Sequence, residues 1–77
     1  MTTIEKLEGM SRETMENVIW GNVLYFYSDS SSKLDIAEMM RLHSNFENEL
    51  GKGALAADNT RIIRIAAEII SLAQKKI

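Results

Sequence analysis

The chain has 77 residues with no cysteine and no proline, and its nine basic and eleven acidic residues give a net charge of −2. The lack of cysteine excludes disulfides and thiolate metal sites. The balanced charge gives no broad basic field that would attract nucleic acid or a membrane surface. Because a chain this short buries only about 60% of its unfolded surface, we expect one small domain over residues 1–77, stabilised by close helix packing, self-association or a partner.

No segment of the sequence is long and apolar enough for a membrane span. The longest apolar stretch is about half of the ~20 residues that a spanning helix needs. The N-terminus also lacks the basic segment and apolar stretch of a secretory signal peptide. We therefore expect a cytoplasmic protein without a membrane span.

The first expected elements are a short N-terminal helical turn and a long helix after it. Thr2 and Glu5 fit a capping box for the short turn. Ser11 is a suitable N-cap for the long helix, which is expected to run from about Arg12 to Tyr27.

Residues 18–27 form the densest apolar block, and their structure has two interpretations. Eight of these ten residues are apolar, and they include the only tryptophan and both tyrosines. As a helix, the block is apolar almost all round. As two strands, it is divided by Gly21-Asn22, a dipeptide typical of β-hairpin turns. We favour the helix, because two strands with no third strand beside them are only marginally stable.

A second long helix is expected over Lys33–Leu50, with Ser32 and Asp35 at its start. Gly51 stands where a helix-ending glycine belongs, and residues 51–53 form the clearest turn in the chain. At 100° per residue, the apolar side chains of this helix share one arc. They are Ile36, Met39, Met40, Leu42, Phe46 and Leu50.

The last helix is expected over Asp58–Lys76, with Asp58, Asn59 and Thr60 as candidate caps. Its apolar side chains cover about half of its circumference, which is wider than the stripe of an ordinary surface helix. This width indicates contact with two neighbouring helices, or with one helix and another chain. The predicted fold is therefore all-α: a compact bundle of three main helices with a short N-terminal helical turn.

Two short segments resemble known families. The stretch from Ser32 to Met39 resembles the start of the second helix in acyl carrier proteins, but Lys33 stands where that family attaches its prosthetic group to serine. Residues 31–35 resemble the Ser-x-x-Leu-Asp signature of small phosphatases that act on response regulators. The apolar pair that should follow Asp35 in that signature is absent. Each resemblance covers only a few residues, and neither assigns an activity.

Catalytic and metal-binding chemistry has few candidate residues. His43 is the only histidine, and with Glu47 four residues later it supplies two metal ligands, whereas metal sites usually need three or four. No glycine-rich elbow surrounds a serine. The acidic residues are spaced along helix faces as in a solvated surface. We therefore expect no enzyme activity, no metal and no cofactor.

The residues that favour a protein partner lie in the apolar block. Trp20, Leu24 and Tyr27 share one face of the first long helix, separate from its predicted core stripe of Met15, Ile19 and Phe26. Either the other helices bury both faces, or the aromatic face binds a second copy or a larger protein, since aromatic residues are enriched at interfaces.

His43 is expected to be either a polar group in that same interface or a core histidine. The function that we expect is that of a small non-enzymatic regulator or inhibitor, which forms a homodimer or docks on a larger protein.

The alternative function is DNA binding by the last helix. Arg61, Arg64 and Lys75 share one of its faces and follow a glycine-containing turn, as in a helix-turn-helix protein. Glu68 lies in the middle of this face, and the net charge of the chain is negative. Because DNA affinity depends on neutralising phosphates, nucleic acid is the less favoured partner.

Overall fold

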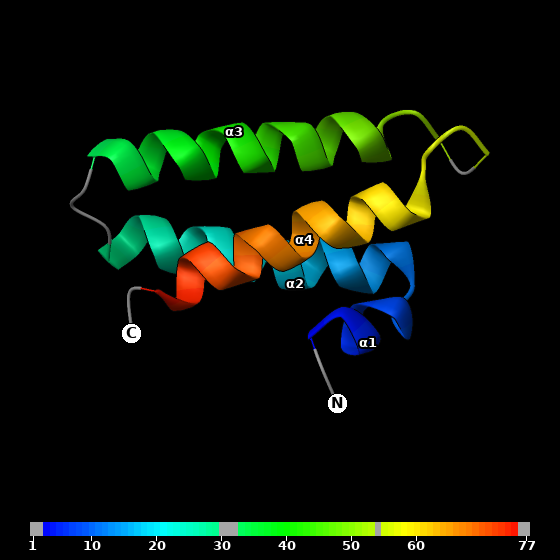
Figure 1. Cartoon of the computed structure of the whole chain (residues 1–77), viewed down its shortest axis with the longest axis horizontal. Helices are drawn as coiled ribbons and strands as arrows, with labels where there is room; N and C mark the ends of the chain where they lie inside the picture. Colours follow the sequence, from blue (N-terminus) through cyan, green and yellow to red (C-terminus); the bar gives the residue numbers. More distant parts are fainter. Residues whose placement is uncertain (1–2, 30–32, 54, 76–77) are drawn as a thin grey trace.

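The computed structural model describes residues 3–29, 33–53 and 55–75. Within these ranges the chain forms four α-helices and no strand (Figure 1). The helices are α1 (Thr3–Glu8), α2 (Arg12–Asp29), α3 (Lys33–Leu50) and α4 (Asn59–Gln74). The predicted all-α bundle of three main helices with a short N-terminal helix is confirmed.

The helix boundaries agree with the sequence-based ranges to within two residues. The α2 helix extends two residues beyond the predicted end at Tyr27, and α4 begins at Asn59 because Asp58 is its N-cap. The Asp58 side chain accepts hydrogen bonds from the backbone N–H groups of Thr60 and Arg61, at 3.0 and 3.3 Å. The predicted roles of Thr2, Ser32 and Lys76 lie outside the described residues.

The α2 helix passes without interruption through Gly21-Asn22, so the hairpin interpretation is wrong. The Asn22 side-chain amide donates to the Val18 carbonyl, one turn earlier, at 2.9 Å. This bond satisfies the amide within its own helix, which is why it is tolerated in an apolar segment. Ser11 begins the helix by accepting a hydrogen bond from the Thr14 backbone N–H at 3.1 Å, as the sequence predicts.

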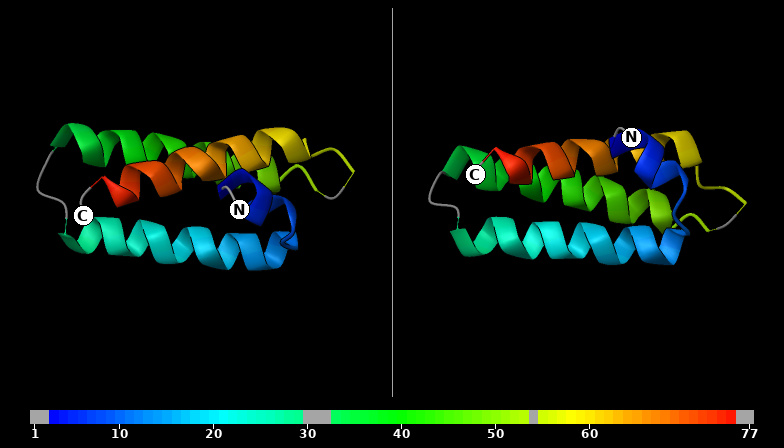
Figure 2. Two further views of the ribbon diagram at one scale, coloured as in Figure 1. Left: turned by 60° about the horizontal axis from the view of Figure 1, so that its bottom comes forward. Right: turned by 90° about the horizontal axis from the view of Figure 1, so that it is seen from below.

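The α4 helix holds the bundle together. It packs against α1, α2 and α3, whereas α2 and α3 touch each other only sparsely. In the left view of Figure 2, α4 lies between α2 and α3, and α1 lies beside α4. The predicted wide apolar surface of α4 is therefore explained by three helical neighbours. Its buried residues are Ile62, Ile63, Ile65, Ala66, Ile69, Leu72 and Ala73.

The α3 helix ends at Leu50, directly before Gly51, as the sequence predicts. The Gly51 N–H donates to the Glu47 carbonyl at 2.9 Å, but Gly51 does not adopt the left-handed conformation that is common for a glycine at this position. The left-handed backbone conformation occurs at Gly53, with φ of 92°. A residue with a side chain is strained in that conformation, so Gly53 is the position where the turn requires glycine.

A buried carboxylate, Glu49, ties the end of α3 to the start of α4. It is 3% exposed and accepts a hydrogen bond from the Asp58 backbone N–H at 2.8 Å. Lys52 Nζ lies 3.1 Å and Arg61 Nε 3.3 Å from its Oε1 atom. The Asp58 N–H and the Lys52 ammonium, in that order, hold the pKa of Glu49 below its usual value. Glu49 therefore contradicts our expectation that the acidic residues are simply solvated.

Arg12, the first residue of α2, holds the other side of this turn. Its guanidinium donates to the carbonyl oxygens of Gly53 and Ala57, each at 3.4 Å. The turn is therefore held by Arg12 of α2 and Glu49 of α3, which both form hydrogen bonds with its backbone.

We expect Gly21→Ala to raise the unfolding free energy by about 0.5–1 kcal/mol, because alanine has less freedom to lose in a helix interior. Gly21 is exposed, and no atom lies within 4 Å of the position that its Cβ would take. Gly53→Ala is the matched control and should lower stability because of its positive φ. Urea denaturation measures both changes, and a loss of stability in Gly21→Ala would contradict the helical assignment.

Glu49→Gln should lower the unfolding free energy at neutral pH and make the unfolding free energy less dependent on pH in the acidic range. Because the folded state lowers the pKa of Glu49, its contribution is complete above the unfolded pKa of about 4.3 and is lost as pH falls through the folded value. Urea midpoints of the wild type and Glu49→Gln, measured between neutral pH and pH 3, should therefore converge on acidification. A constant difference across this range would show that the charge of Glu49 contributes nothing.

Candidate functional site

The main candidate site is an exposed apolar surface shared by α2 and α3. We define the α2–α3 face as Trp20, Leu24 and Tyr27 of α2 together with Met40 of α3. These residues are 43%, 60%, 38% and 59% exposed, respectively. The opposite side of α2 is fully buried in the core through Met15, Ile19, Val23 and Phe26. The two predicted faces of α2 are therefore distinct, and the bundle covers only one of them.

The Trp20 and His43 rings bring α2 and α3 together at this face. Their centroids lie 4.6 Å apart and their planes are inclined by 78°, an edge-to-face contact. The His43 side chain is only 17% exposed. The structure therefore places His43 at the edge between the core and the α2–α3 face, beside Trp20.

Met40 adds a residue of α3 to this face. It belongs to the apolar arc predicted for this helix, but it is exposed, whereas the neighbouring Met39 is completely buried. Met40 precedes His43 by one helical turn, so it lies on the side of α3 that turns toward α2. Its place at the margin of the apolar arc is the sequence signal for this exposure.

Two polar groups of α3 lie beside Trp20 without a hydrogen bond. His43 Nε2 and Glu47 Oε1 are buried atoms that have no hydrogen-bonding partner, although they lie 3.3 Å apart. Their geometry does not form a hydrogen bond, but a protonated imidazole at this distance would form an ion pair with the carboxylate. On α2, partial burial raises the pKa of the Tyr27 phenol above its usual value.

The basic residues of α4 are dispersed around its exposed side. Arg61, Arg64 and Lys75 are all exposed. Arg61 is already paired with the buried Glu49, and Lys75 lies near the other end of the helix, beside the cleft between α3 and α4. These three side chains therefore do not form one compact basic patch.

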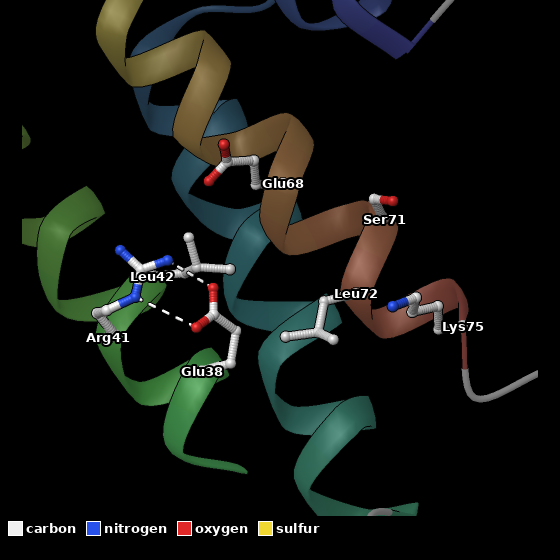
Figure 3. A pocket seen from close by; sticks show the side chains of 7 residues that line it. All are labelled: Glu38, Arg41, Leu42, Glu68, Ser71, Leu72 and Lys75. Atoms are coloured by element: carbon white, nitrogen blue, oxygen red, sulfur yellow. Dashed lines mark hydrogen bonds and ion pairs between the residues drawn. The ribbon is translucent and has the colours of Figure 1, made fainter. Parts of the chain in front are cut away.

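The cleft between α3 and α4 has balanced charges (Figure 3). It has a volume of about 320 Å³ and is lined by Glu38, Arg41, Leu42, Glu68, Ser71, Leu72 and Lys75. Arg41 Nε donates to Glu38 at 3.2 Å, and this bond holds the pKa of Glu38 below its usual range. Two carboxylates face two cations in the cleft, so no unmatched charge remains to select an ionic ligand.

The described residues contain neither a metal-binding cluster nor a helix that could cross a membrane. No group of three or more histidine, aspartate or glutamate side chains among them converges to hold a metal ion. In the same part of the chain, no helix has both the length and the apolar character needed to cross a membrane.

Comparison with protein families, with curated proteins and with solved structures finds no match.

We expect His43→Phe to stabilise the fold by about 1 kcal/mol at pH 8. The substitution removes a buried nitrogen that lacks a partner and keeps an aromatic ring beside Trp20, which benefits from an edge-to-face contact. Chemical denaturation at low protein concentration measures the change. A loss of stability above about 1 kcal/mol would show that the imidazole makes an interaction that phenylalanine cannot replace.

Proposed function

We propose that this chain is a small, non-enzymatic cytoplasmic regulator or inhibitor that acts by binding protein through its α2–α3 face. The observation that carries the proposal is the exposure of four large apolar side chains on one side of a folded bundle: Trp20, Leu24, Tyr27 and Met40. Trp20 and Tyr27 would serve as aromatic anchors, and Leu24 and Met40 would fill the space between them.

The size of this face suits a protein interface. From their exposed fractions, the four side chains present on the order of 400 Å² of mostly apolar surface. A stable interface buries about 800 Å² on each partner, of which roughly 60% is apolar. The face therefore provides most of the apolar area that such an interface needs. None of the four side chains carries a charge, which also suits the centre of a protein interface, where charged residues are depleted.

DNA binding stays the alternative prediction, and no observation in the structure favours it. A recognition helix must offer one long side to the major groove, whereas α4 is buried against three other helices. Arg61, one of its three proposed contacts, is already paired with Glu49.

Two matched leucine substitutions test the proposal. Leu24 lies on the α2–α3 face, whereas Leu34 is 84% exposed and lies about 120° around α3 from Met40 at 100° per residue. The immobilised chain is incubated with an extract of its source cells, to which labelled copies of the same chain are added. We expect Leu24→Asp to release the bound protein, and Leu34→Asp and Arg64→Ala to retain it.

Equal binding by Leu24→Asp and Leu34→Asp would contradict the proposal. Loss of binding in Arg64→Ala, together with salt-sensitive retention of DNA, would favour the alternative. Circular dichroism of each variant confirms that the helices are intact.

A further inference from the structure

We propose that the partner of the α2–α3 face is a second copy of this chain, bound antiparallel about a two-fold axis at the level of Leu24 and Met40. This inference rests on the proposed function, because it uses the same face. It adds the identity of the partner, the position of the symmetry axis and the contacts between the copies. The register of α2 and α3 and the charges at the two ends of the face support this arrangement.

The Trp20–His43 contact fixes the register of the two helices. The α2 and α3 helices run in opposite directions (Figure 1). A residue three positions after Trp20 therefore lies level with the residue three positions before His43. Met40 is therefore level with Val23, next to Leu24. This level is midway between Trp20 and Tyr27, so the two aromatic side chains of the face lie symmetrically on either side of it.

The outward stripe of α3 is symmetric about the same level. Its positions repeat at spacings of four and three, which places them on one side of the helix. They are Lys33, Ala37, Met40, Ser44 and Glu47. Met40 is the only large side chain among the inner three, and small residues on either side of it allow two helices to approach closely. Lys33 and Glu47 stand two turns, about 10 Å, to either side of Met40.

The charges select an antiparallel pair of copies. A two-fold axis that lies in the interface and runs perpendicular to the helices places α2 against α2 and α3 against α3 of the second copy, with each pair of helices antiparallel. Lys33 of one copy then meets Glu47 of the other, and the contact occurs twice because the interface is isologous. Lys33 is exposed, and the Glu47 side chain is 36% exposed. An axis parallel to the helices would instead place α3 of one copy against α2 of the other, so that Lys33 and Glu47 would not meet.

The same axis pairs the apolar side chains. Trp20 of one copy lies level with Tyr27 of the other, while Leu24 and Met40 each meet their own symmetry mates. Because the centre of the face carries no charge, self-association brings no like charges together there. The area of the face is also close to the apolar area of a standard dimer interface.

A charge swap tests both the partner and its direction. We expect Lys33→Glu alone, or Glu47→Lys alone, to raise the dimer dissociation constant roughly tenfold, since each breaks two exposed ion pairs and creates repulsion. The double variant Lys33→Glu/Glu47→Lys should restore the constant to within about threefold of the wild type. Sedimentation equilibrium measures all four proteins. A double variant as weak as the single variants would overturn the antiparallel arrangement.

A cysteine on the axis provides an independent test, because the chain has no cysteine of its own. We expect Met40→Cys to form an intermolecular disulfide at least tenfold faster than Leu34→Cys under the same mild oxidation, since only position 40 meets its own symmetry mate. Equal rates would overturn the position of the axis.

A wild-type chain that is monomeric at every accessible concentration would overturn the proposal of a second copy. That result would leave the proposed function intact if Leu24→Asp, but not Leu34→Asp, still released a cellular protein. A wild-type dimer whose dissociation constant is unchanged by Leu24→Asp would overturn the second-copy proposal at this face. The two failures are therefore distinguishable.

Discussion

The fold depends on the burial of α4 between the other three helices. Its isoleucine-rich sides contact α1, α2 and α3, while α2 and α3 make few contacts with each other. The backbone measures only 16 Å across its shortest dimension, which corresponds to about two helices packed 8–10 Å apart. A bundle this thin cannot cover both sides of every helix. The helix with the most apolar residues outside its core stripe, α2, therefore leaves Trp20, Leu24 and Tyr27 exposed.

The turn between α3 and α4 keeps α4 in its central position. Glu49 binds the backbone of Asp58, the N-cap of α4, and Arg12 binds the carbonyls of Gly53 and Ala57. These contacts join the end of α3, the start of α4 and the start of α2. The charged groups at this end of the bundle thus have a structural role, whereas the α2–α3 face is formed by apolar side chains.

Sequence periodicity predicted the three main helices and the separation of the two faces of α2. Periodicity left the structure around Gly21-Asn22 open, because a dipeptide typical of hairpin turns lies within a helical pattern there. The hydrogen bond from the Asn22 side chain to the Val18 carbonyl shows how the helix accommodates this amide. Periodicity missed Glu49, although this residue follows Phe46 and Leu42 at helical spacing on the buried arc. A carboxylate at such a position is understood only when its donors, which come from the turn after α3 and the start of α4, are known.

Periodicity placed Met40 on the apolar arc of α3 but did not predict its exposure, because an apolar arc does not show how much of it a neighbouring helix covers. The exposure of Met40 follows from the sparse contact between α2 and α3, which is a tertiary property. The same tertiary property creates the α2–α3 face, since Trp20 and Met40 become part of one surface only when the two helices lie antiparallel.

Trp20 fluorescence across a dilution series, recorded together with the molar mass by light scattering, tests the central claim most directly. Trp20 is the only tryptophan and lies within the proposed contact. The account predicts a dimer at high concentration and a shift of the emission to longer wavelength as the mass falls to that of the monomer. A constant emission spectrum through dissociation would contradict it, because the copies would then join elsewhere.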